Sequence, residues 1–135
     1  MKIVCLLIAI VVGVRAQGHE SLEIEIQCLN QLNMTMLEVL PYVHKITDPS
    51  DNEDVGEFLA CAWQGRNIIG PDGRVNGEYV AQYLIDIYKN ITNEQKNQIR
   101  EESKQCEKLK SNKLSALGIK VKNCIIIAAD IVGIS

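Results

Sequence analysis

Histidine is scarce in this chain, and no two cysteines have the Cys-x-x-Cys spacing. The two histidines, His19 and His44, lie far from any cysteine at ligand spacing, so a tetrahedral zinc site has no donor set. The Gly-x-Ser-x-Gly motif is also missing, and no carboxylate accompanies His44 at a recognisable spacing. We therefore expect no metal site, no cofactor and no catalytic activity.

The chain also lacks an apolar run of the about 20 residues that a membrane-spanning helix needs. The run from Ile3 to Val14 has twelve, follows Lys2 and leads to Ala16, a small residue that suits a cleavage site. The apolar end of the chain is interrupted by Asp130. We predict a signal peptide over residues 1–16 and one secreted, extracellular domain over residues 17–135, without stable membrane insertion.

Basic residues are outnumbered once the predicted leader is removed. Lys2 and Arg15 leave with it, so twelve basic residues face seventeen acidic ones and the net charge is about −5. This charge argues against nucleic acid or an anionic membrane as a partner. Two Asn-x-Thr sequons, at Asn33 and Asn90, are compatible with secretion.

The cysteine count becomes even when Cys5 leaves with the leader. Cys28, Cys61, Cys106 and Cys124 remain. An even set in an oxidising compartment predicts two disulfides, and three pairings are open from the count alone.

Aromatic residues make up 4% of the chain and prolines number three, while the apolar residues recur at helical spacing. The first predicted helix carries apolar residues from Leu22 to Leu40, and Pro41 ends or bends it. Another helix begins at the acidic cluster of residues 51–54 and stops at Gly65.

Later in the chain, turn and cap signals separate further helices. Two tight turns are predicted, at Pro71-Asp72-Gly73 and at Asn76-Gly77. The loop starts like a calcium loop but has Arg74 where the ion needs oxygen, so we expect no calcium. Thr92 and Gln95 have capping-box spacing at the start of a charged helix. The carboxylate pairs Glu23/Glu25 and Glu101/Glu102 are expected on solvated surface.

The predicted fold is all-α, with six short helices that carry cysteines on the first, third, fifth and sixth. This layout resembles the insect odorant-binding protein family, in the form that lacks the second and fifth of six cysteines. Glu57, four residues before Cys61, and Ser115, nine residues before Cys124, stand where the full pattern has those two cysteines. The loop of residues 67–79 also looks like the family's connector. The resemblance implies disulfides Cys28–Cys61 and Cys106–Cys124.

The resemblance also implies a function: a secreted carrier that encloses a small hydrophobic molecule, such as an odorant or pheromone, in an internal cavity. It implies a chemosensory receptor as a further partner, and a monomer or weak homodimer. The alternative is a secreted interaction protein, such as a venom, seminal or gland component, whose helices are simply packed and which has no ligand cavity.

Eight large apolar residues lie on the predicted inward stripes of five helices and are the candidate ligand contacts. Within this set, Trp63 and Tyr83 each add one polar atom that could orient an alcohol, aldehyde or ester. The apolar residues after Cys124 are expected to fold back over the cavity as a lid. The eight candidates are Met36, Leu40, Phe58, Trp63, Tyr83, Ile87, Val121 and Ile125.

Overall fold

The computed structural model describes the backbone of residues 15–134 and the side chains of residues 23–134. Of the predicted leader, residues 1–14 lie outside the described part, while Arg15 and Ala16 belong to the first described helix.

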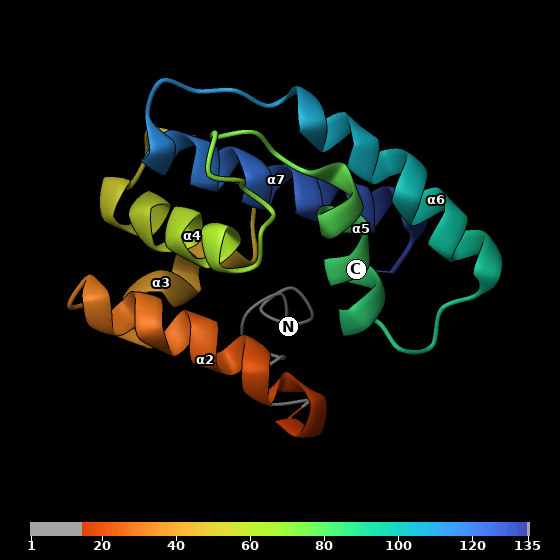
Figure 1. Cartoon of the computed structure of the whole chain (residues 1–135), viewed down its shortest axis with the longest axis horizontal. Helices are drawn as coiled ribbons and strands as arrows, with labels where there is room; N and C mark the ends of the chain where they lie inside the picture. The colour runs from red at the N-terminus through yellow and green to blue at the C-terminus, as the bar shows by residue number, and fades with distance from the viewer. Residues whose placement is uncertain (1–14, 135) are drawn as a thin grey trace.

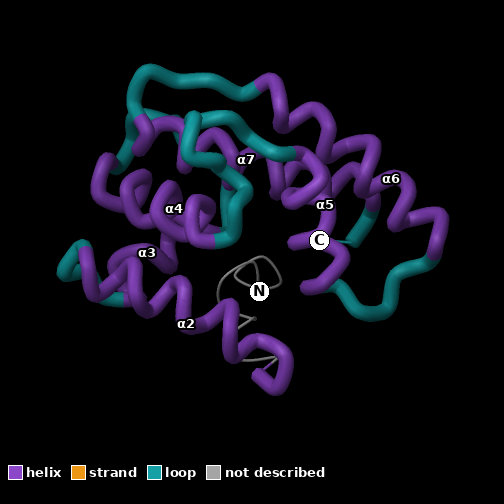
Figure 2. Tube along the Cα trace, viewed as in Figure 1, coloured by secondary structure: helices purple, strands orange, loops and turns teal. Residues whose placement is uncertain are grey.

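Six α-helices make up the described fold (Figures 1 and 2), and no strand occurs within residues 15–134 apart from a single bridge between Ile69 and Val75. The all-α prediction is therefore confirmed. The short 3-10 helix η2 (Lys104–Lys108) continues the fifth helix. The helices are α2 (Arg15–Gln31), α3 (Met36–Val43), α4 (Glu53–Gly65), α5 (Gly77–Ile87), α6 (Asn93–Ser103) and α7 (Leu114–Val132).

The predicted disulfides are both present. Cys28–Cys61 joins α2 to α4, and Cys106–Cys124 joins η2 to α7, each with Cα atoms 5.9 Å apart. The two bridges therefore tie the first described helix and the α6–η2 segment to the central pair of helices, α4 and α7.

Helices α4 and α7 pack against each other more extensively than any other pair, and in Figure 1 α7 runs behind α4 and α6. Two glycines allow this close approach. A Cβ added at Gly118 of α7 would lie 2.6 Å from the Ala60 backbone nitrogen and 2.6 Å from the Gly56 carbonyl oxygen of α4. The small residues let the two backbones meet almost directly.

We expect Gly118→Ala to lower the free energy of unfolding by about 1 to 3 kcal/mol, because the α4 backbone must move to admit the methyl group. The loss should exceed the gain of up to about 1 kcal/mol that alanine brings to a helix. Gly65→Ala is the matched control, since its Cβ would meet the movable Ile24 side chain. Urea unfolding of both variants checks this. Wild-type stability in Gly118→Ala would contradict the close approach.

Several helix boundaries follow the predicted cap signals. Asn52 caps α4 by accepting a hydrogen bond from the Val55 N–H, and α4 ends at Gly65. Thr92 caps α6, where the Thr92 hydroxyl accepts from the Gln95 N–H and the Gln95 side chain accepts from the Thr92 N–H.

The single helix predicted over Leu22 to Leu40 is wrong, because the chain turns between α2 and α3. Asn33 adopts a left-handed conformation with φ of 56°, which ends the first helix. Thr35 then starts α3, and its N–H donates to the Glu38 carboxylate at 3.0 Å. Pro41 lies inside α3 and does not end it. The local conformation of Asn33 and the capping by Thr35 therefore set the helix boundary, although apolar residues continue at helical spacing across it.

Of the two predicted tight turns, the first is confirmed. The Gly73 N–H donates to the Gly70 carbonyl, and Gly73 has φ of 82°. The second is wrong, because Asn76 caps α5 instead: its side-chain oxygen accepts from the N–H groups of Glu78 and Tyr79.

The predicted fold-back after Cys124 is also wrong. Helix α7 continues without a break to Val132, because no helix-breaking residue occurs before Gly133, which ends it in the left-handed conformation. The apolar residues of this last part divide between two faces. Ile125, Ile126, Val132 and Ile134 are buried, whereas Ile127 and Ile131 are exposed.

Candidate ligand-binding site

The eight candidate contact residues come from four helices, α3, α4, α5 and α7, and not from the five expected. Met36 and Ile87 are half-buried and pack against the main core, and Leu40 is half-buried as well. The other five belong to one buried cluster: Phe58, Trp63, Tyr83, Val121 and Ile125.

An aromatic pair forms the middle of this cluster. The rings of Trp63 and Tyr83 meet edge to face, with centroids 5.4 Å apart and planes at 83°. The Trp63 indole N–H donates to the Gly118 carbonyl at 3.0 Å, so its one polar atom links α4 to α7. The indole donates its only N–H in this bond, so Trp63 has no further polar atom to offer a ligand.

A buried ion pair lies on the other side of Tyr83. Arg66, which directly follows α4, donates to both carboxylate oxygens of Glu25 on α2, at 2.7 and 2.8 Å. Its guanidinium carbon lies 4.9 Å from the centre of the Tyr83 ring, a cation–π arrangement. These contacts connect α2, α4 and α5 beside the candidate contact residues Trp63 and Tyr83.

Glu25 was expected on solvated surface, and the structure corrects this, because its side chain is only 1% exposed. Burial raises the pKa of the Glu25 carboxyl above its ordinary value, and the charge and hydrogen bonds of Arg66 act in the opposite direction. Sequence patterns do not reveal this pair, because Arg66 lies 41 residues after Glu25.

A surface pocket of about 250 Å³ opens beside the ion pair. It lies against α2 and α5, and Tyr83 and Arg66 both contribute to its lining. Its lining combines apolar and polar side chains: Ile24, Arg66, Ile68, Tyr79, Gln82, Tyr83 and Asp86.

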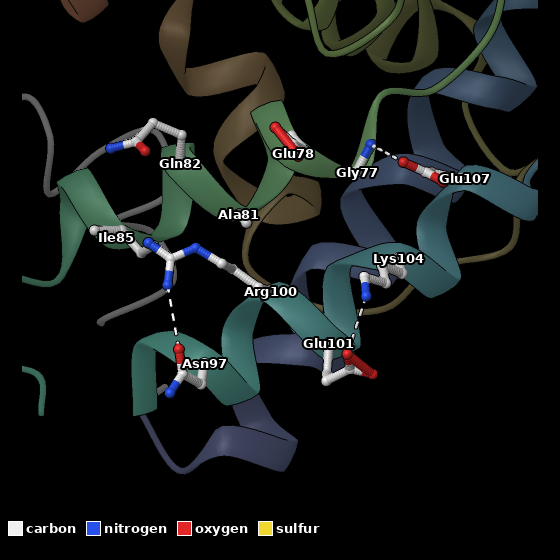
Figure 3. Close-up of a pocket in the computed structure, with 10 residues that line it drawn as sticks. All are labelled: Gly77, Glu78, Ala81, Gln82, Ile85, Asn97, Arg100, Glu101, Lys104 and Glu107. Atoms are coloured by element: carbon white, nitrogen blue, oxygen red, sulfur yellow. Dashed lines mark hydrogen bonds and ion pairs between the residues drawn. The ribbon is translucent and has the colours of Figure 1, made fainter. Parts of the chain in front are cut away.

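A larger groove of about 610 Å³ separates α5 from α6 and η2 (Figure 3). Gly77, Ala81 and Ile85 of α5 line it beside charged side chains, including Lys104, which pairs with Glu101 at 3.0 Å. The Glu107 carboxylate accepts from the Gly77 N–H at 3.0 Å. None of the eight candidate residues lines this groove.

Another buried charged side chain, Lys122, lies on α7. Lys122 is 1% exposed, and its amine donates to the carbonyls of Tyr42 and Lys45 and to the Thr47 hydroxyl. The neighbouring Asn123 bonds both the N–H and the carbonyl of Thr47. Together the two side chains fasten the chain after α3 to α7.

Among the described residues, no group of three or more His, Cys, Asp or Glu side chains is arranged to hold a metal ion. Within the same part of the chain, no helix is both long enough and apolar enough to cross a membrane.

The sequence was also compared with known proteins. A model of the PBP/GOBP family matches residues 14–126, which include α3 to α6 and most of α2 and α7. No curated protein and no solved structure gives a significant match.

Proposed function

Because the chain belongs to the PBP/GOBP family of insect odorant-binding proteins, whose members are small-ligand carriers, we propose that it carries a small hydrophobic molecule outside the cell. The cargo is an odorant, a pheromone or another lipophile, and the task is transport, not chemistry. The family match over residues 14–126 is the observation that carries this proposal.

In this proposal the ligand lies between the central helices. Phe58 and Trp63 of α4, Tyr83 of α5, and Val121 and Ile125 of α7 belong to one apolar cluster. Ligand pockets are lined mainly by such side chains, with a few polar atoms that orient the ligand. In this proposal the pocket of about 250 Å³ beside Tyr83 is the entrance.

A binding assay with two matched variants tests whether Val121 contacts the ligand. We expect a fluorescent naphthylamine to bind the wild-type protein and to be displaced by long-chain alcohols. Val121→Phe should weaken binding at least about tenfold with little change in melting temperature, since the new ring occupies ligand space.

Ile119→Phe is the control for this assay, because Ile119 is buried two residues away and so on nearly the opposite side of α7. It should destabilise the fold by about 1 to 3 kcal/mol through overpacking and leave the affinity of folded protein near wild type. A wild-type protein that binds no probe, together with a Val121→Phe variant that melts as early as Ile119→Phe, would refute the carrier proposal.

A further inference from the structure

The hydroxyl of Ser103 is buried without a hydrogen bond. Ser103 is fully buried at the end of α6, and among the described residues no partner lies within hydrogen-bonding reach of its Oγ atom. A helical serine often bonds the carbonyl four residues before it, but this bond is not formed here. Because an unpaired buried hydroxyl costs stability, it calls for a partner such as water or a ligand.

Ser103 lies between α5 and α7, the two helices that carry four of the eight candidate contact residues. Helix α6 packs against both α5 and α7, and Ile99 and Ser103 are its buried residues. The Cys106–Cys124 disulfide ties the chain three residues after Ser103 to α7, directly before Ile125. On the α5 side, the Ser103 carbonyl would lie 2.9 Å from a Cβ added at Gly77.

We propose that the Ser103 hydroxyl bonds the polar head of the bound lipophile, an inference that rests on the proposed carrier function. A hydroxyl both donates and accepts, so it can pair with an alcohol, an aldehyde or an ester. One neutral hydroxyl does not compensate the desolvation of a carboxylate. The ligand class is therefore a neutral oxygenated lipophile, selected over a hydrocarbon and over an ionised fatty acid.

Decanol and decane are suitable probes because they share a chain and differ by one hydroxyl group. The full chain is expressed in insect cells and the secreted protein is collected. Binding of each probe to this protein is measured from its partition between headspace and solution. Ser103→Ala should weaken decanol binding about three- to tenfold, the size of one hydrogen bond, and leave decane binding unchanged. The melting temperature should stay the same or rise, because an unpaired buried polar atom is removed.

Ser115→Ala is the matched control, since Ser115 is a buried serine of α7 whose Cβ lies against Gly56 at the contact with α4. It should preserve the decanol-to-decane ratio. An unchanged ratio in Ser103→Ala, while the wild type binds both probes, would overturn this inference and leave the carrier function standing. A wild-type protein that binds neither probe would overturn both.

Discussion

Replacing Arg66 by methionine is expected to lower the free energy of unfolding by about 3 to 5 kcal/mol at neutral pH. The change keeps the apolar bulk of the side chain but leaves the Glu25 carboxylate buried without its counter-charge. It also removes the cation from the face of Tyr83. Urea unfolding of wild type and variant at about pH 7 measures the loss.

The pH dependence of this loss identifies its cause. Without Arg66, only a backbone hydrogen bond opposes the desolvation of Glu25, and the pKa of its carboxyl rises further. A raised folded-state pKa means that the folded protein holds the proton more tightly than the unfolded chain, so stability falls as the pH rises through that pKa. The loss in Arg66→Met should therefore be smaller at about pH 4 than at about pH 7.

Two further variants distinguish the effect of breaking the buried ion pair from the effect of removing any arginine side chain. Adding Glu25→Leu to Arg66→Met should recover most of the lost stability, because no charge is then buried. Arg74→Met removes the arginine of the exposed pair with Asp72, 3.7 Å apart, and should cost at most about 1 kcal/mol. Equal losses in Arg66→Met and Arg74→Met would show that burial of the pair contributes nothing.

The parts of the fold that the sequence predicted are those set by local chemistry. Asn52, Gly65 and the Thr92/Gln95 box act through neighbours within four residues, so their patterns can be read directly. The split between α2 and α3 was missed because the apolar period continues across it. The decisive signals, a left-handed Asn33 and a capping Thr35, are weak beside that period.

The candidate site was predictable in its apolar part and not in its polar part. Periodicity finds inward-facing residues such as Phe58 and Val121, since burial of apolar surface is the general rule. Glu25 was assigned to the surface, and nothing in the sequence marks Lys122 as buried, because charged side chains are buried only when a partner distant in sequence compensates them. Those partners, Arg66 and the oxygens of residues 42–47, are recognisable only after folding.

Alkaline pH should stabilise the wild-type protein relative to Lys122→Met by up to about 3 kcal/mol. Burial, followed by the neighbouring Lys45 charge, lowers the pKa of Lys122 from 10.5 to about 8, although Asp51 acts in the opposite direction. Between these two values the unfolded chain keeps a proton that the folded protein has released. Stability therefore increases with pH across this interval, and below about pH 8 the folded state bears the full cost of a buried ammonium group.

The difference in unfolding free energy between wild type and Lys122→Met, followed from about pH 7 to about pH 10, isolates this effect from other titrating groups. Lys120→Met is the matched control on the same helix: Lys120 bonds the exposed Lys110 carbonyl, and its removal should leave the pH profile parallel to that of wild type. A Lys122→Met profile parallel to wild type would mean that the three oxygens around the amine, on Tyr42, Lys45 and Thr47, fully replace its hydration. A difference that grows with pH instead shows that burial of the ammonium group destabilises the folded state and that loss of its proton relieves this cost.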